Sequence, residues 1–466
     1  MLDQFAVILP EIMLASVAMV MQLIGVCYKN ASRQVATAAK IFSIGIVCYL
    51  LYFIPEYKLA FTDSFATSPA IAIFKALILG LAVMSLIIYH DLMIIIKQNV
   101  QIEFITLILL STLGVFISIS ACDFILLFCG LELQALSGYA LAAFNTGHAK
   151  SSEAGLKYFI LGALMSSLML LGITFLYGFS GSIKFVEINT ALNGEFNIGL
   201  VVGAVLVLAA ILFKLSAAPL HFWTPDVYEG APISSVSYFA VAQKLGMLVV
   251  LINIVDGVIG SYLPISGQLI KIIAIFSMIV GALGAIMQVS LKRLMAYSTI
   301  LNIGYVLVGV CLHSPPGNYA AFVYMLIYVI GAMGFFVCLV AIFGGKSDEA
   351  TFEDLKGIAA ERKALAASIA IIMFSMIGLP PMAGFFGKYY VFYNAILQGE
   401  IMLAMIGILT SVIAAFYYLK VIKYMYFIEA SNEISTIPTQ RGLCFVTVIS
   451  LAFILCFFSF VPTYIL

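Results

Sequence analysis

The chain has 466 residues, of which 64% are hydrophobic and only 9% are charged. Soluble domains carry about 25% charged residues, so this composition excludes a soluble globular protein. It indicates a polytopic membrane protein whose main surroundings are the lipid bilayer. The formal net charge is zero, which argues against a nucleic-acid partner.

The expected fold class is all-α, with about fourteen transmembrane helices counted from apolar windows of about 20 residues. The N-terminal window has acidic Asp3 and Glu11 but no preceding basic residue, which favours a permanent first span over a cleaved signal peptide. The predicted spans lie near residues 5–27, 38–55, 70–90, 103–120, 123–145, 155–178, 198–219, 233–256, 268–290, 294–312, 318–344, 364–397, 401–427 and 442–462.

Lysine and arginine are distributed unevenly among the predicted connections. About fifteen of them follow odd-numbered spans, whereas the connections after even-numbered spans hold only Lys58, Lys184 and Lys271. Under the positive-inside rule, the odd connections face the cytoplasm or matrix and both termini face the opposite side. The one long charged connection, around residues 344–364, is expected to be a solvated linker, with a short helix on the membrane surface as the alternative.

The sequence gives no sign of a metal or redox centre. None of the eight cysteines belongs to a C-x-x-C pair, and the four histidines lie near the ends of predicted spans. Iron–sulfur and zinc sites need clustered thiolates. We therefore expect no metal and no cofactor in this chain.

Three lysines and one glutamate stand out because they lie within strongly apolar stretches: Glu132, Lys214, Lys244 and Lys388. A charge at the bilayer centre costs about 2.5–3.5 kcal/mol, so such residues are rare and mark ion or proton pathways. Burial disfavours a charged form and a nearby opposite charge favours it, so a lysine under both influences can change its protonation state near neutral pH. Glu132 is predicted to modulate Lys214. Lys244 would then receive the proton and Lys388 would hand it on. A structural ion pair is the alternative, but it leaves two lysines uncompensated.

Two apolar stretches, residues 199–228 and 364–397, are longer than a bilayer requires and are interrupted by proline. Pro219 interrupts the first, and Pro380 with Pro381 interrupts the second. A proline within a helix removes one backbone hydrogen bond and displaces the carbonyl four residues earlier. These stretches are therefore predicted to be broken helices.

The carbonyl freed by Pro219 would be that of Leu215, and in lipid it needs a partner from protein or water. Each break also has a lysine close by, Lys214 in the first stretch and Lys388 in the second. Their separation suggests two inverted repeats of roughly 170 residues with an ion site at each break.

Other polar residues have weaker interpretations. Lys75 lies early in the third span and is expected to extend to the membrane interface. Lys292 and Arg293 are expected to be positive-inside anchors, with an inner gate at Lys292 as the alternative. Several tyrosines either support water chains or simply pack as aromatic rings: Tyr297, Tyr305, Tyr324, Tyr328 and Tyr417.

At these residues the chain resembles the antiporter-like subunit family of proton-pumping NADH:quinone oxidoreductase, respiratory complex I, and within it the subunit N branch. The resemblance spans roughly residues 120–400. The matching runs are FCGLELQALSGYAL, FKLSAAPLHFWTPDVYEGAP, AQKLGML, SLKRLMAYSTILNIGY and SMIGLPPMAGFFGKYYVF. The run DVYEGAP and Lys388 together favour this branch, because sibling subunit M typically has glutamate at the position of Lys388.

By that resemblance, Glu132 pairs with Lys214, Lys244 is the central relay and Lys388 connects to the far side. Second-tier candidates are Lys292, His221 and Asn302. Related chains often have histidine at the position of Asn302, and because asparagine cannot titrate, we assign it no proton uptake. A water hydrogen-bonded to it would keep a proton path continuous.

The resemblance also implies an organisation into N-terminal helices 1–3, two five-helix repeats and a last helix. The corresponding ranges are residues 1–100, 101–258, 259–428 and 429–466. The implied partners are other membrane-arm subunits, antiporter-like and small, with NAD, FMN, iron–sulfur clusters and quinone held in partner subunits. The implied activity is proton translocation as part of this enzyme.

The expected location is the bacterial inner (plasma) membrane, with several passes and both termini on the periplasmic side; an organellar inner membrane remains open. The alternative function is a subunit of a monovalent cation/proton antiporter without redox coupling. A scaffold that holds only structural ion pairs is a third possibility.

Overall fold

A computed structural model describes residues 2–27, 32–194, 197–259, 264–429, 438 and 440–460. Among these residues the secondary structure is helical except for one antiparallel hairpin, in which β1 (Lys58–Ala60) pairs with β2 (Phe65–Thr67). Twelve helical stretches of the described chain are long and apolar enough to cross a membrane. The fold is therefore an all-α polytopic membrane protein, as predicted.

Every predicted span coincides with one or more of these helices. Their bounds are α1 (Leu2–Val7), α2 (Leu9–Cys27), α3 (Ser32–Tyr52), α4 (Pro69–Ile95), α5 (Ile102–Ser120), α6 (Phe124–Ala142), α7 (Ala149–Ser180), α8 (Phe185–Leu192), α9 (Ile198–Leu215), α10 (Trp223–Gly230), α11 (Ile233–Tyr238), α12 (Lys244–Ile254), α13 (Pro264–Ile286), α14 (Leu291–Val310), α15 (Pro315–Phe343), α16 (Ile358–Glu361), α17 (Lys363–Ile377), α18 (Ala383–Leu397), α19 (Ile401–Phe427) and α20 (Arg441–Cys456). The predicted end of the last span, 461–462, lies outside the described residues.

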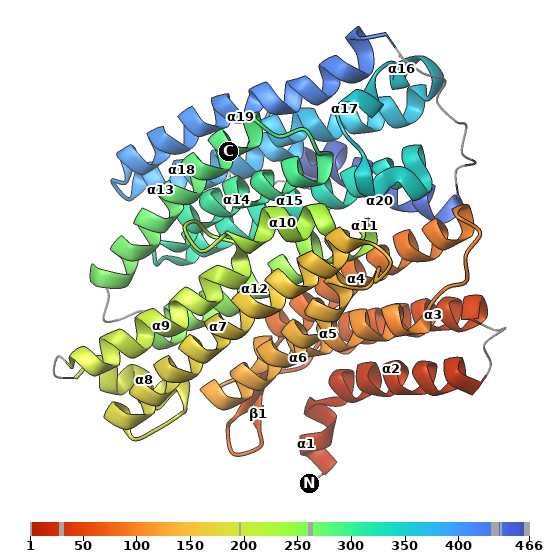
Figure 1. Cartoon of the computed structure of the whole chain (residues 1–466). Helices are drawn as coiled ribbons and strands as arrows, with labels where there is room; N and C mark the ends of the chain where they lie inside the picture. The colour runs from red at the N-terminus through yellow and green to blue at the C-terminus, as the bar shows by residue number, and fades with distance from the viewer. Residues whose placement is uncertain are drawn as a thin grey trace. The chain divides into compact units, whose positions relative to one another are not determined.

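The chain divides into two compact units. The first consists of residues 1–93, 98–215 and 242–266, and the second of residues 94–97, 216–241 and 267–466. In the first unit α5 and α6 lie side by side, and α7 runs alongside α9 (Figure 1). Helix α12 packs on α5 and α9. In the second unit α15 contacts α14, α17, α18 and α20.

Local sequence signals define several helix ends and contacts. Asp123 caps α6 by accepting a hydrogen bond from the Leu126 amide at 2.7 Å. The close contact of α5 with α6 depends on Gly114 and Gly130, because a side chain at either position would collide with the backbone of the other helix. Small residues allow membrane helices to approach in this way.

Both predicted helix breaks are present. Helix α9 stops at Leu215 and helix resumes in α10, while α17 stops at Ile377 and helix resumes in α18. The residue after each stop, Ser216 or Gly378, has a positive φ, +67° and +92° respectively, as is common after a helix C-terminus. The helices therefore end before the prolines, and Pro219 and Pro380 lie in the non-helical connections.

The connection at residues 344–364 is not the solvated linker that was expected. It forms short helical turns, including α16, and its Phe352, Leu355 and Ile358 side chains are buried. The Leu291 amide donates to the Ala350 carbonyl at 3.0 Å, which joins this segment to the start of α14. The apolar residues spaced along the segment fold it onto the second unit despite its charges.

Candidate functional site

Glu132 of α6 and Lys214 of α9 both belong to the first unit, and the proposed pairing between them stays a prediction. The Lys214 Nζ donates a hydrogen bond to the Leu131 carbonyl of α6 at 3.2 Å. The neighbouring Glu132 carboxylate instead accepts a hydrogen bond from the Ser166 hydroxyl of α7. Lys214 therefore binds α6 next to the carboxylate, while α7 supplies the group that holds the carboxylate.

Lys244 closes the end of the first broken helix. It is the first residue of α12 and is only 1% exposed, and its Nζ donates to the Lys214 carbonyl at 2.9 Å. The last four carbonyls of a helix lack intrahelical partners, and a cation at that end is favoured by the helix dipole. The carbonyl that Lys244 binds is that of Lys214, one residue before the Leu215 carbonyl for which a partner was expected.

A π-helical turn, Phe239–Gln243, precedes Lys244 directly. Such turns shift the register of side chains and are frequent at functional sites. Gln243 in this turn donates to the Ser111 hydroxyl of α5 at 3.1 Å. Consecutive contacts thus link α6, α9 and α12 through Lys214 and Lys244. Two amines and one carboxylate share this apolar part of the first unit, and ionising both amines there is costly.

Lys388 makes a similar contact at the second broken helix, from the resumed helix α18. Its Nζ donates to the carbonyls of Met376 and Ile377, the last residues of α17, at 3.0 and 2.9 Å. It also donates to the Ser411 hydroxyl at 2.7 Å and lies 5.3 Å from the centre of the Tyr305 ring. In each unit, therefore, a buried lysine from the following part of the chain closes the C-terminus of an interrupted helix.

Asn302 stands in a network of hydroxyl groups in the second unit. Its Oδ1 accepts from the Tyr324 hydroxyl at 2.5 Å, and its Nδ2 donates to the Ser298 carbonyl at 2.7 Å. The Tyr418 and Ser298 hydroxyls are 2.6 Å apart, and Tyr328 bonds Thr299 at 2.7 Å. The Asn302 side chain thus contacts a tyrosine directly, and the water expected beside it stays a prediction. Tyr324 and Tyr328 are thus hydrogen-bonded groups as well as packed rings.

Lys292 and Arg293, which were expected to be positive-inside anchors, both bind groups of the second unit. Lys292 is 1% exposed, and its Nζ donates to the Ala231 carbonyl at 2.8 Å and lies 3.3 Å from the Asp348 carboxylate. Asp348 also accepts from the Ile233 amide at 2.6 Å, so it caps the start of α11. These contacts fix the turn between α10 and α11.

Arg293 also contacts α10. Its guanidinium lies 2.8 Å from the Asp226 carboxylate and 2.9 Å from the Glu229 carboxylate. Sequence reasoning missed these acidic partners. The available signal was the i, i+3 spacing of Asp226 and Glu229, which places both on one helix face opposite a dibasic turn.

Replacing Asp348 by alanine is expected to destabilise the complex by about 3 kcal/mol, because Lys292 would keep a buried charge and the Ile233 amide would lose its acceptor. The thermal denaturation midpoint of the assembled complex measures this. Asp354→Ala is the matched control, since Asp354 is exposed and bonds only to nearby Thr351. Equal midpoints for the two variants would contradict the assignment.

His221 lies in the first break, between α9 and α10. Its ring stacks on Phe222 with a centroid separation of 5.2 Å. Its Nδ1 is buried and has no hydrogen-bond partner in the described structure. This contact is local, and it leaves the second-tier assignment of His221 as a prediction.

The Lys75 side chain is buried against other helices instead of extending to solvent. Its side chain is 2% exposed, and its Nζ lies 2.5 Å from the Glu11 carboxylate of α2. The Phe65 and Phe116 rings lie 5.1 and 5.8 Å from the same Nζ. A carboxylate on a neighbouring helix allows the amine to stay buried. The acidic residue in the first predicted span was the signal for this pair.

These features define a polytopic helical membrane protein whose two interrupted helices carry buried ionisable groups, an architecture suited to moving ions across a bilayer. The family model of the NADH:quinone oxidoreductase/Mrp antiporter transmembrane proteins matches residues 121–414. NADH-quinone oxidoreductase subunit N of Rickettsia bellii is 53% identical over 97% of this chain and 99% of its own length. NADH-quinone oxidoreductase subunit N 1 of Acidiphilium cryptum is 42% identical over 91% of this chain and 89% of its own length. The chain belongs to the NADH-quinone oxidoreductase subunit N family.

Solved structures show the same fold. A chain of respiratory complex I from Thermus thermophilus is 26% identical, covers 96% of this chain and 97% of its own, and gives a TM-score of 0.80. A chain of the archaeal membrane-bound sulfane sulfur reductase gives a TM-score of 0.82 at 21% identity. The match covers 99% of this chain and 95% of that one. A chain of the Mrp complex from Dietzia gives a TM-score of 0.77 at 19% identity. The match covers 96% of this chain and 92% of that one.

Proposed function

We propose that this chain is a proton-translocating membrane-arm subunit of NADH:quinone oxidoreductase, driven by quinone reduction elsewhere in the complex. The relatives named NADH-quinone oxidoreductase subunit N, with near-complete coverage on both sides, support this assignment. The chain acts as part of the enzyme, with no redox centre of its own. NAD, FMN, iron–sulfur clusters and quinone belong to partner subunits.

The observation that carries the mechanism is the closure of both broken helices by a lysine ammonium. A protonated amine binds the negative end of a helix more strongly than a neutral amine does. The protonation state of Lys244 is therefore coupled to the geometry of the break after Lys214. The same coupling holds for Lys388 and the end of α17.

In the proposed sequence, Glu132 sets the charge state of Lys214 from the adjoining position on α6. Lys244 receives the proton, and Lys388 passes it toward the far side. In the second unit the hydroxyls around Asn302 continue the path, because each can both donate and accept a hydrogen bond. Asn302 orders this network without taking up a proton.

The remaining assignments follow from the family. Two inverted repeats, residues 101–258 and 259–428, would each contain one broken helix, with residues 1–100 and 429–466 added outside them. The partners are the other membrane-arm subunits. The location is the inner membrane of a bacterium, with both termini on the periplasmic side, as the distribution of basic residues supports.

A monovalent cation/proton antiporter subunit is the second candidate, and the shared fold of the Dietzia Mrp chain is what favours it. Isolation of the native assembly separates the two. Co-purified flavin and iron–sulfur subunits with NADH-driven proton uptake in vesicles would support the first function. Sodium-dependent proton exchange without NADH would support the second.

Replacing Ser166 by alanine tests the role of Glu132. A hydrogen bond to a charged group is worth about 1.5–3 kcal/mol, so the Glu132 carboxylate should be held much less firmly without the Ser166 hydroxyl. We expect fewer protons pumped per NADH at an unchanged amount of complex. Ser167→Ala is the control, because the Ser167 hydroxyl is exposed and bonds only the Ala163 carbonyl of its own helix. Identical proton yields in both variants would oppose this role.

A further inference from the structure

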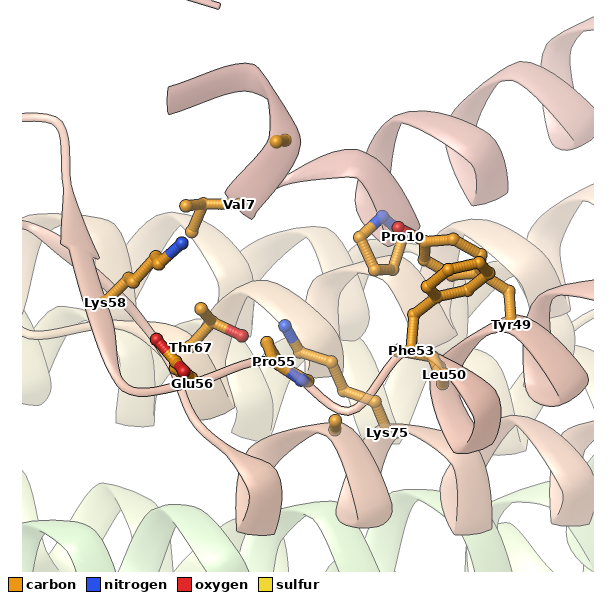
Figure 2. Close-up of a pocket in the computed structure, with 12 residues that line it drawn as sticks. Val7, Pro10, Tyr49, Leu50, Phe53, Pro55, Glu56, Lys58, Thr67 and Lys75 are labelled. Carbon is orange, nitrogen blue, oxygen red and sulfur yellow. The ribbon is translucent and has the colours of Figure 1, made fainter. Parts of the chain in front are cut away.

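The N-terminal part of the first unit contains a cavity of about 160 Å³ that the proposed proton path does not use. About 10–15 Å³ is enough for one water, so this space admits a larger polar group. The cavity lies among the α1–α2 junction, the end of α3, the hairpin and α4 (Figure 2). Its lining residues are Ala6, Val7, Pro10, Tyr49, Leu50, Phe53, Pro55, Glu56, Lys58, Thr67, Ala72 and Lys75.

One side of the cavity is apolar and the other is polar. Figure 2 shows the rings of Tyr49 and Phe53 beside Pro10, with Lys58, Glu56 and Thr67 on the opposite side. Such a division suits an amphiphile, whose polar group binds one side while its apolar part follows the other.

The position of the cavity along α3 places it at the membrane surface. Helix α3 is a candidate span that ends at Tyr52, which is 82% exposed, and Phe53 follows it with 59% exposed. Exposed aromatic residues at the end of a span mark the headgroup level of a bilayer. The charged residues Glu56 and Lys58 come next in the chain, as expected where the protein leaves the hydrocarbon layer.

The charges in the cavity specify the headgroup. The Lys75 amine is neutralised by Glu11 at 2.5 Å. Within the described residues, Glu56 and Lys58 have no ion-pair partner, so the cavity offers one free carboxylate and one free ammonium. A lone anion would satisfy only Lys58, whereas a zwitterion satisfies both.

We propose that this cavity binds the headgroup of a membrane phospholipid that carries a primary ammonium, of the phosphatidylethanolamine class. Lys58 and the Thr67 hydroxyl hold the phosphate, and Glu56 accepts hydrogen bonds from the ammonium. Tyr49, Phe53 and Pro10 pack against the glycerol and the first acyl carbons. Lys75, paired with Glu11, also lines the site.

The test uses the assembled complex in lipid nanodiscs with photoactivatable phospholipids that differ only in headgroup: ethanolamine, glycerol or choline. Labelled peptides are identified by mass spectrometry. We expect the segment of residues 1–75 to be labelled most by the ethanolamine lipid. Excess soluble glycerophosphoethanolamine should leave this labelling unchanged, because the acyl chains contribute to binding. Loss of the label to this competitor, or equal labelling by all three lipids, would overturn the proposal.

Variants at the exposed residues Glu56 and Lys58 sharpen the test, since neither is part of the proton path. Lys58→Gln should lower labelling by all three lipids about two- to five-fold, the range of one partly solvated charge contact. Glu56→Gln should remove the preference for ethanolamine over choline. Lys184→Gln is the matched control. The Lys184 amine lies 3.9 Å from the carboxylate of Asp63, which belongs to the turn of the same hairpin, but Lys184 does not line the cavity. Equal effects of the Lys58 and Lys184 variants would contradict the site.

Discussion

Replacing Lys244 by arginine is expected to abolish proton pumping while the complex remains assembled. Arginine keeps a positive charge and hydrogen-bond donors, so it can still bind the carbonyl of Lys214 at the end of α9. Its guanidinium does not deprotonate in proteins, and it therefore cannot pass a proton on. Because proton transfer by a positioned side chain contributes about 10²–10⁴-fold to a rate, pumping should fall by at least about a hundredfold.

The measurement is NADH-driven acidification in vesicles that contain equal amounts of complex, with quinone reductase activity recorded in the same sample. Lys244→Met supplies the comparison, since it removes both the proton carrier and the helix-closing contact. Lys157→Arg is the control, as Lys157 is exposed and pairs with Glu153 on its own helix. If Lys244→Arg pumps normally and only Lys244→Met fails, Lys244 is a structural cap and the relay is wrong.

Apolar windows predicted the spans because each transmembrane helix must satisfy its own backbone hydrogen bonds, whatever its neighbours are. The helix breaks were predictable for the same local reason, since proline cannot continue a helix. The exact stop before Pro219 was not predicted, because it depends on the left-handed conformation of Ser216.

The contacts of the buried charges depend on residues far apart in the sequence, and these the sequence could not determine. Ser166 reaches Glu132 from the next helix, and Lys244 reaches the carbonyl of Lys214 from another. The apolar periodicity within one span says nothing about such pairs. The resemblance paired Glu132 with Lys214, but it gave no hint of Ser166 and Leu131 as the hydrogen-bond partners of these two side chains.

Lys75 shows where local reasoning was wrong. A lysine near the end of an isolated span can extend its stem to the interface. Here Glu11 of α2 provides a counter-charge at 2.5 Å, and the Phe65 and Phe116 rings offer their faces to the same amine. Extending to water would break the ion pair and leave the carboxylate of Glu11 buried alone. The pairing therefore keeps the Lys75 amine buried.

This pair leads to the second large expected effect. Lys75→Met should destabilise the N-terminal helices by about 3–5 kcal/mol, because it leaves the buried Glu11 carboxylate without a counter-charge. Glu11→Leu should be similarly harmful through the unpaired amine of Lys75. The double variant Glu11→Leu/Lys75→Met should recover most of the loss, since an apolar pair in this place has no charge to desolvate.

Thermal denaturation midpoints of the purified complex, together with the amount of this subunit in membranes, measure the three variants as a double-mutant cycle. The pair Glu153→Leu/Lys157→Met is the control, because that ion pair is exposed, with side-chain exposures of 61% and 43%, and should show almost no coupling. A double variant at Glu11 and Lys75 that is as unstable as the sum of the single variants would show that the two side chains act independently. Recovery in the double variant would instead show that charge balance, rather than either side chain alone, keeps the N-terminal helices in place.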